Sequence, residues 1–175
     1  MKKRSEVAPQ ASGYGVQELN QTQLAWLAGF TDGDGCIMAT IVPKPDYAII
    51  KYQLKLTLSF TQKARRKFYL ILLRKLIGKG CLRDKKDGQF ELALVGPEAI
   101  SLIKRMKPFL FMKQKQASLA IEIFEQLPTA KKNPVQFFNL CVLADRLSNY
   151  NDTKKRTITS ETVRGNFLVL GLITE

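Results

Sequence analysis

The chain has 175 residues, of which 45% are hydrophobic and 25% charged; this length suits one domain, and this composition excludes an intrinsically disordered chain. Twenty-eight Lys and Arg against 15 Asp and Glu give a net charge of +13, which favours a nucleic acid partner over a generic basic surface or an anionic membrane. The absence of histidine excludes Ser-His-Asp triads, Cys-His pairs and histidine-ligated metals, so hydrolytic chemistry would use carboxylates, a metal, Lys, Arg or bound water.

The first predicted element is a helix from Asn20 to Thr31. Residues 1–19 are basic but lack the apolar segment of a secretory signal, and we expect them to form a mobile tail. Asn20 or Thr22 can cap the helix, its apolar residues recur at helical spacing, and the Gly-rich stretch after Thr31 ends it. A strand is predicted over residues 36–42, followed by a proline-containing loop.

Residues 51–60 give the clearest periodicity in the chain. Polar and apolar residues alternate strictly, which predicts a strand with one apolar face and one polar, basic face. The polar positions are Lys51, Gln53, Lys55, Thr57 and Ser59, and the apolar positions are Tyr52, Leu54, Leu56, Leu58 and Phe60.

The following elements are a helix and a hairpin. Residues 68–77 predict an amphipathic helix that Gly78 and Gly80 stop, and residues 81–86 and 89–95 predict two strands joined across Asp87-Gly88.

Three helices are predicted after the hairpin. They cover residues 98–106, 114–127 and 134–148, with prolines at or near their ends, and the chain from residue 149 has no clear pattern. The order of helix, two strands, helix, two strands and helices predicts one α+β domain with an antiparallel sheet.

The polar face of this sheet is basic. Lys51 and Lys55 lie on one predicted strand, and Arg83 and Lys85 on another. These residues are either a solvated face, which is normal for an antiparallel sheet, or a surface that lies in the DNA major groove, where Lys and Arg read guanine and Gln reads adenine.

Three cysteines, Cys36, Cys81 and Cys141, are odd in number and far apart. This pattern predicts free thiols in a reducing compartment rather than disulfides or a zinc site. No apolar run approaches the roughly 20 residues that span a bilayer, so we expect a soluble protein without a membrane partner.

The stretch LAGFTDGDG, residues 27–35, joins the first helix to the first strand. Its Asp-Gly-Asp-Gly part could be a turn or a cation site, and it lacks the further oxygen ligands of an EF-hand loop. A helix C-terminus carries partial negative charge, so a carboxylate there strengthens a field that attracts a divalent cation. Small residues at positions 28, 29 and 33 would also let two such helices pack closely.

LAGFTDGDG resembles the motif of the LAGLIDADG homing endonucleases, and the predicted order of elements resembles the αββαββα fold of that family. The similarity covers residues 20–165, the expected endonuclease domain, with residues 166–175 as a C-terminal tail. It is greatest to single-motif members from algal chloroplast introns and includes residues 61–66, 113–116 and 151–164.

The resemblance implies an active site. Asp34 matches the metal ligand of the motif, and Gly33 would contribute its backbone carbonyl. Gln62, Arg66 and Lys113 match the polar residues that order water and phosphate, and the cofactor implied is Mg²⁺, with Mn²⁺ as a substitute. Asp32 is expected to be a structural group at the helix end.

The resemblance also implies DNA contacts from the sheet and the loop between its first two strands. The matching positions are Thr40, Lys44, Asp46, Tyr47, Gln53, Lys55, Ser59, Arg83 and Lys85, and a C-terminal phosphate-contacting loop matches at Lys154 and Lys155.

One motif per chain implies a homodimer, paired through motif helices that include Leu27, Ala28, Gly29 and Gly33. The implied function is a site-specific endonuclease that cleaves double-stranded DNA at a long pseudo-palindromic site by metal-assisted phosphodiester hydrolysis, leaving 3′ overhangs. No small-molecule substrate is expected, and the family resemblance places the protein in a chloroplast or another organelle. An RNA maturase or a catalytically silent DNA-binding module would use the same fold, but the four polar residues of the implied active site favour the nuclease.

Overall fold

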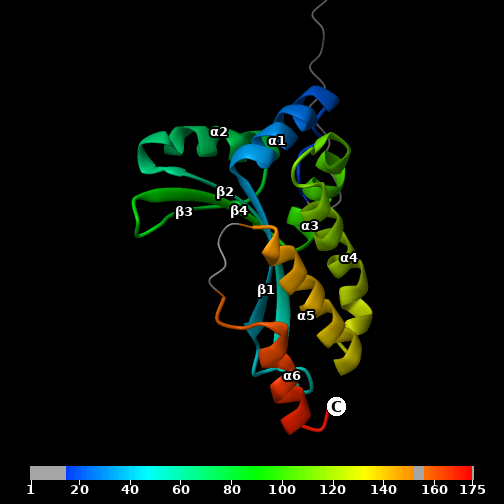
Figure 1. The fold of residues 1–175 in the computed structure, drawn as a ribbon. Helices are drawn as coiled ribbons and strands as arrows, with labels where there is room; N and C mark the ends of the chain where they lie inside the picture. The colour runs from blue at the N-terminus through cyan, green and yellow to red at the C-terminus, as the bar shows by residue number, and fades with distance from the viewer. Residues whose placement is uncertain (1–14, 152–155, 175) are drawn as a thin grey trace, which may run out of the picture.

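The computed structural model describes residues 15–151 and 156–174. Four strands form one antiparallel sheet in the order β1-β2-β4-β3, which confirms the expected α+β class (Figure 1). The strands are β1 (Gly35–Pro43), β2 (Tyr52–Lys63), β3 (Cys81–Asp84) and β4 (Gln89–Val95).

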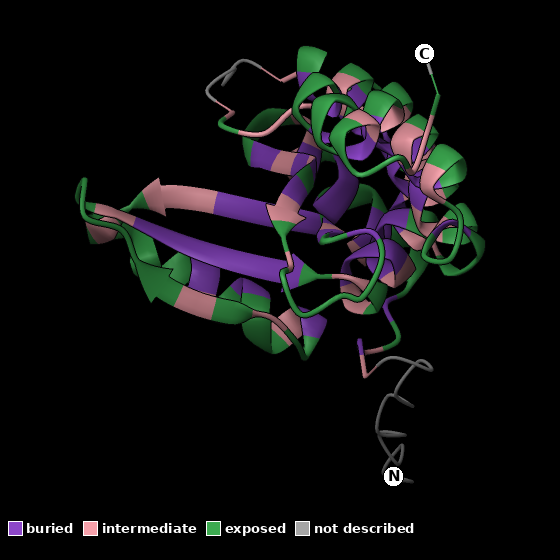
Figure 2. Ribbon diagram, turned by 90° about the horizontal axis from the view of Figure 1, so that it is seen from below, coloured by how far each residue is buried: buried purple, intermediate pink, exposed green. Residues whose placement is uncertain are grey.

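The alternation in β2 gives the sheet one buried face. Tyr52, Leu54, Leu56, Leu58 and Phe60 are all 7% exposed or less, so the predicted apolar positions of this strand do lie in the core. Figure 2 shows the sheet from below, with exposed residues along its outer edge at β3. The β3–β4 hairpin turns at Gly88, whose φ of +73° favours glycine.

Helix α1 (Gln21–Asp34) begins with a capping box, in which the Asn20 side chain accepts from the Gln23 backbone and the Gln23 side chain accepts from the Asn20 backbone. The helix runs to Asp34, three residues beyond its predicted end, because strand β1 follows it without a loop. A Cβ at Gly35 would lie 2.7 Å from the Thr31 Cα, so this direct turn requires glycine.

The remaining helices lie along one side of the sheet and leave its other face open (Figure 1). They are α2 (Lys67–Ile77), which follows a 3₁₀ turn at Ala64–Arg66, and then α3 (Pro97–Met106), α4 (Gln114–Ala130), α5 (Pro134–Asn149) and α6 (Ser160–Val169). Helix α4 continues through Pro128, beyond its predicted end at residue 127, because a proline this close to the C-terminus disturbs only the last turn.

Three features differ from the sequence-based expectations at the edges of the elements. Lys51 does not belong to the polar face of β2. It precedes the strand with a φ of +59°, and its Nζ donates to the Pro45 carbonyl oxygen at 3.1 Å. Helix α6 crosses the domain boundary expected at residue 165, and Phe167 is fully buried. Val16, expected in the N-terminal tail, is also fully buried.

Cys141 is fully buried on α5. Burial, and secondarily the nearby Asp145 carboxylate, raise the pKa of this thiol from 9.0 to about 12. Cys81 and Cys141 are free thiols, as the sequence predicts. In the part of the chain that the structure describes, no helix combines the length and the apolar character of a membrane span.

Candidate functional site

Three of the four residues expected to form the active site meet at the C-terminal end of α1. Asp34 is the last residue of this helix and is exposed. Because Gly35 pairs with Phe60, the end of α1 lies next to the end of β2, and Gln62 Nε2 donates to Asp34 Oδ2 at 2.7 Å. The helix end and the strand pairing therefore bring together two residues that are 28 positions apart.

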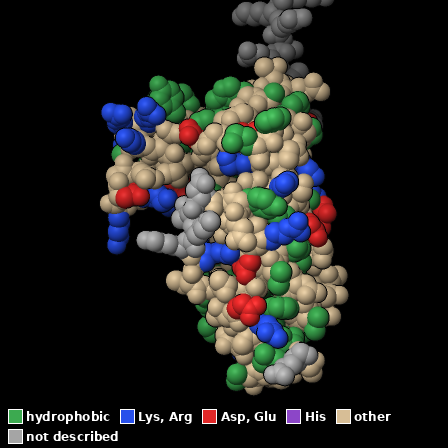
Figure 3. Space-filling view, viewed as in Figure 1, with side chains coloured by type: hydrophobic (Ala, Val, Ile, Leu, Met, Phe, Trp, Pro, Cys, Tyr) green, Lys and Arg blue, Asp and Glu red, His purple; other side chains and the backbone are tan. Residues whose placement is uncertain are grey.

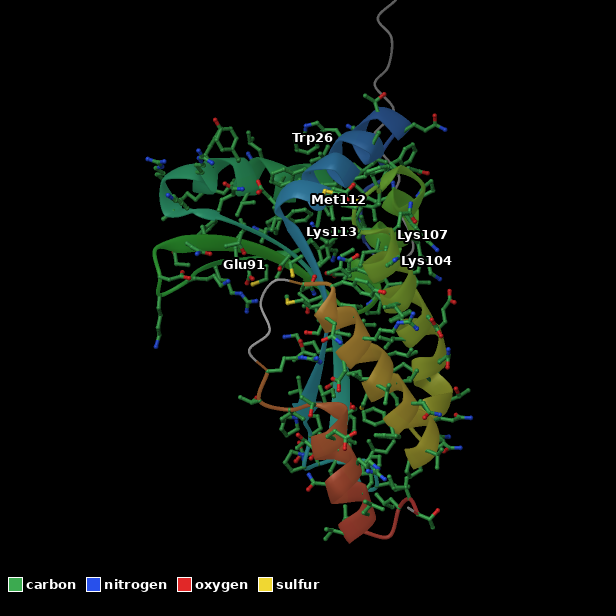
Figure 4. The ribbon with its side chains drawn as sticks, in the orientation of Figure 1. Trp26, Glu91, Lys104, Lys107, Met112 and Lys113 are labelled. Atoms are coloured by element: carbon green, nitrogen blue, oxygen red, sulfur yellow. The ribbon has the colours of Figure 1, made fainter. Side chains whose placement is uncertain are left out.

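Lys113 approaches the same helix end from the segment that precedes α4. Its Nζ donates to the Asp32 carbonyl oxygen at 2.5 Å, so its charge lies where the helix carries partial negative charge. The Asp32 carboxylate accepts from the backbone nitrogens of Phe111 at 2.7 Å and Lys113 at 2.9 Å. Asp32 thus holds the Lys113 segment against α1, the structural role expected of it, and Figure 4 shows Lys113 near this junction.

Arg66 is the fourth expected member of the active site. It ends the 3₁₀ turn after β2 and is exposed. Within residues 15–151 and 156–174, no hydrogen bond or ion pair joins Arg66 to Asp34, Gln62 or Lys113. The exposed guanidinium is free to contact a ligand bound over Asp34.

The donor set at this helix end fits a hard divalent cation. A hollow of about 650 Å³ is lined by Gly33 and Asp34 on one side and by residues 111–116 on the other. The Asp34 carboxylate lines this hollow, and carboxylate oxygens suit Mg²⁺. Among the described residues, no group of three or more acidic, cysteine or histidine side chains could hold a metal. Asp34 is the one acidic side chain among the described residues that line this hollow.

The open face of the sheet carries many of the expected DNA-contacting residues. Thr40 and Lys55 are a cross-strand pair and both are exposed, while Gln53 is half-buried opposite Val42. Ser59 lies on the same face but is only 3% exposed. Lys44, Asp46 and Tyr47 lie in the loop between β1 and β2, which a hydrogen bond from the Lys44 nitrogen to the Lys51 oxygen closes at its base.

Arg83 and Lys85, also expected to contact DNA, share one acidic partner on this face. Arg83 Nε donates to Glu91 Oε2 at 2.5 Å, and Lys85 Nζ lies 3.7 Å from Glu91 Oε1. Glu91 is not among the site residues predicted from the sequence. The signal in the sequence is an acidic residue at an outward position of β4, next to strands whose outward positions include lysine and arginine.

Lys154 and Lys155 lie outside the described residues, but both ends of their segment are anchored. Asn151 Nδ2 donates to the Ile37 carbonyl oxygen at 2.9 Å, and Arg156 Nη1 donates to Asp145 Oδ1 at 2.6 Å. A second hollow, of about 410 Å³, lies between the open face of the sheet and these anchors.

The surface of α1 differs from the interface expected for a dimer. Leu27 and Ala28 are fully buried in the core of the chain itself, so their side chains cannot contact a second chain directly. Gly29 and Gly33 are exposed, and a Cβ at either position would meet no atom within 4 Å. The helix therefore presents a flat surface at its two glycines.

Large apolar side chains are exposed on α1, on α2 and before α4, and we call them together the apolar surface. Figure 3 shows several clusters of hydrophobic side chains on this face of the molecule, and Figure 4 labels Trp26 and Met112. The members, with their exposed fractions, are Trp26 (56%), Phe68 (61%), Tyr69 (65%), Phe111 (90%) and Met112 (71%). Exposed apolar groups of this extent are typical of a protein interface. No pattern in the sequence predicted this surface.

Residues 27–117 match the LAGLIDADG endonuclease family. The chain is 43% identical to the DNA endonuclease I-CreI of Chlamydomonas reinhardtii over 146 residues, which cover 83% of this chain and 88% of the relative. It is 39% identical to the DNA endonuclease I-CvuI of Chlorella vulgaris over 153 residues, covering 87% and 94% respectively.

Solved structures show the same fold. The structure of I-CvuI in complex with its target, in the presence of 2 mM Ca, matches with a TM-score of 0.81 and 37% identity, covering 88% of this chain and 98% of that one. The archaeal intron-encoded homing endonuclease I-Vdi141I complexed with DNA matches with a TM-score of 0.75 and 18% identity, covering 86% and 98% respectively, a likeness of fold.

Proposed function

Because the chain belongs to the LAGLIDADG endonuclease family, we propose that it is a homing endonuclease, which as a homodimer cuts both strands of a long pseudo-palindromic DNA site and leaves 3′ overhangs. The observation that carries this proposal is the arrangement at the end of α1. There, an exposed Asp34 accepts a hydrogen bond from Gln62, and Lys113 is held against the same helix end by Asp32.

Each residue of this arrangement has a role that its chemistry supports. Asp34 and the Gly33 carbonyl would hold Mg²⁺, for which Mn²⁺ would substitute, and the bound cation would supply a Lewis acid for the phosphate and its attacking water. Gln62 fixes the orientation of the Asp34 carboxylate and can position water with its remaining groups. Lys113 and Arg66 place positive charge where the phosphoryl group gains negative charge. Two structures of the relative I-CvuI on DNA were obtained in the presence of Mg or Ca, in agreement with use of a divalent cation.

A second chain is required because a duplex has two scissile phosphates and each chain has one Asp34. Two-fold pairing through Gly29 and Gly33 brings the two α1 helices together, and with them the two Asp34 carboxylates. The apolar surface around α1 supports this pairing, because burial of Trp26, Phe111 and Met112 would favour association.

The sheet and the β1–β2 loop would supply recognition of the site. Lys55, Arg83 and Lys85 lie on the open face, where a groove-bound sheet reads base edges, and the net charge of +13 attracts the phosphate backbone. The relatives come from Chlamydomonas reinhardtii and Chlorella vulgaris, and we place this protein in an organelle, the chloroplast in an alga.

Cleavage of a randomised duplex library tests the proposed function. The protein is incubated with the library in Mg²⁺, and the ends of the products are sequenced. We expect one family of pseudo-palindromic sites with 3′ overhangs and no product in EDTA. Binding of duplex DNA without cleavage would indicate a silent binding module, and preferential binding of a structured intron RNA would indicate a maturase.

A further inference from the structure

Glu91 is the acidic side chain at the centre of an otherwise basic part of the sheet. It lies on β4, directly opposite Thr61 of β2 on one side and Arg83 of β3 on the other. Cross-strand partners share a face of a sheet, so Glu91, which Figure 4 labels, points to the same open side as Arg83. Its side chain is 7% exposed, whereas those of Arg83 and Lys85 are 54% and 40% exposed.

Both oxygens of the Glu91 carboxylate are engaged. Oε2 accepts from Arg83 Nε at 2.5 Å, and Oε1 lies 3.7 Å from Lys85 Nζ. A carboxylate that is this buried needs partners that compensate its lost hydration, and these two cations supply them. The contact therefore limits the conformations available to two long side chains.

The contact with Arg83 uses Nε, which leaves the other side of the guanidinium available. Among the described residues, the two terminal nitrogens of Arg83 make no hydrogen bond. These two nitrogens are the pair that can donate together to O6 and N7 of a guanine. A fixed Nε limits the directions in which this pair can point, and the Arg83 side chain is 54% exposed on the open face of the sheet.

A buried negative charge on a DNA-binding face works against affinity, because it repels phosphate and reduces the local positive potential. Its benefit would be specificity. An unrestrained arginine can move between a base edge and a nearby phosphate, whereas a restrained arginine loses less conformational entropy when it binds the base and reaches the phosphate less readily.

We propose that Glu91 is a positioning residue for sequence recognition: its carboxylate holds Arg83 so that the free edge of the guanidinium reads one guanine in each half of the site. This inference rests on the proposed function as a DNA endonuclease. Lys85 lies beside Arg83 and is held more loosely by the same Glu91 carboxylate.

The test compares base preference in three variants: Glu91→Gln, Arg83→Ala and the double variant. The binding of each is measured against duplexes that carry every single-base change in the site. Arg83→Ala identifies the symmetric pair of positions that Arg83 reads, where a bidentate contact discriminates by about 5- to 150-fold. We expect Glu91→Gln to lower discrimination at that same pair at least about fivefold, with other positions changed less than about twofold. The double variant should show no further loss beyond Arg83→Ala.

Glu125→Gln is the matched control. Like Glu91, Glu125 accepts a hydrogen bond from a cationic side chain. Its donor is Lys104 Nζ at 2.5 Å, and this pair joins helices α3 and α4 rather than strands of the sheet. This control removes the same charge and should leave every base preference unchanged. Glu91→Asp keeps the charge with a shorter reach, and an intermediate loss at the same pair supports the proposal even if Glu91→Gln folds poorly.

Three results would overturn the proposal. Glu91→Gln could keep the full preference at the Arg83 positions, or weaken all positions evenly, as a purely structural residue would. It could also change preference at a different pair of positions, which would mean that Glu91 reads a base itself. If the wild-type protein distinguishes no duplex from any other, the proposed function fails as well, an outcome that the wild-type measurement alone reveals.

Discussion

Replacement of Gly29 by leucine should separate the two chains without damaging either one. Gly29 lies in the middle of α1, is exposed, and would have nothing within 4 Å of an added Cβ. The single chain therefore has room for a larger side chain at this position. Leucine is also a better helix former than glycine by about 0.8 kcal/mol, so the folded chain should become slightly more stable.

The dimer should respond in the opposite direction. If two α1 helices meet at Gly29 and Gly33, each leucine enters a close helix contact, and overpacking of this kind costs about 1–3 kcal/mol per site. Two-fold symmetry places the change in both chains, so the dimer is destabilised by about 2–6 kcal/mol, which raises its dissociation constant roughly 30-fold to 20,000-fold.

Sedimentation velocity over a dilution series measures this effect. The wild-type protein should sediment at about twice 19.8 kDa, and Gly29→Leu should approach 19.8 kDa with an unchanged circular dichroism spectrum. Gly165→Leu is the matched control, because Gly165 is an exposed glycine in α6 with equal room for a Cβ. A Gly29→Leu protein that remains a dimer, or an equal effect of Gly165→Leu, would refute pairing through α1.

Two further substitutions, and the chemistry of Cys141, have defined outcomes. Lys113→Met should lower the single-turnover cleavage rate about 100- to 1,000-fold with less than about a tenfold change in site affinity, and an unchanged rate would remove Lys113 from the active site. Lys154→Ala should weaken binding to all sequences alike. It should also lower the slope of log affinity against log salt concentration by about one unit for each phosphate that the lysine no longer neutralises. A changed base preference would contradict a contact between Lys154 and the DNA backbone. Because the pKa of Cys141 is raised from 9.0 to about 12, about one thiol in 10,000 is ionised at pH 8, so iodoacetamide should modify exposed Cys81 and spare Cys141 until the protein unfolds. The same shift lowers stability as pH rises above 9.0, since only the unfolded thiol ionises there, and urea unfolding of the wild-type protein and a Cys141→Ala variant at pH 8 and pH 10 measures it.

The sheet could be predicted well from the sequence because its signals are local. Strict alternation fixes the buried face of β2, and the Asp87-Gly88 pair fixes the turn between β3 and β4. Helix α6 lacked such a signal. Only Ser160, Val163 and Phe167 of its ten residues are buried, so its apolar stripe is too short to stand out from a polar tail.

The candidate active site could be located from the sequence, whereas Glu91 and the apolar surface could not. The motif and its outlying matches pointed to Asp34, Gln62 and Lys113, whose catalytic roles stay a prediction, and the structure brings all three to one helix end. The role of Glu91 depends on which residues of β2 and β3 lie opposite it, and the apolar surface depends on how residues from three segments are exposed. Neither is a property of one segment of sequence.

Cleavage and binding by Asp34→Asn, measured on the same selected duplex in Mg²⁺, test the central claim most directly. The substitution keeps the size of the side chain and its ability to accept the hydrogen bond from Gln62, but it removes the charge that would hold a cation. We expect no double-strand product above background, with site affinity equal to that of the wild-type protein or higher, because a negative charge near phosphate is removed. Wild-type cleavage by Asp34→Asn would contradict the assignment of the metal-binding carboxylate and the proposed active site with it.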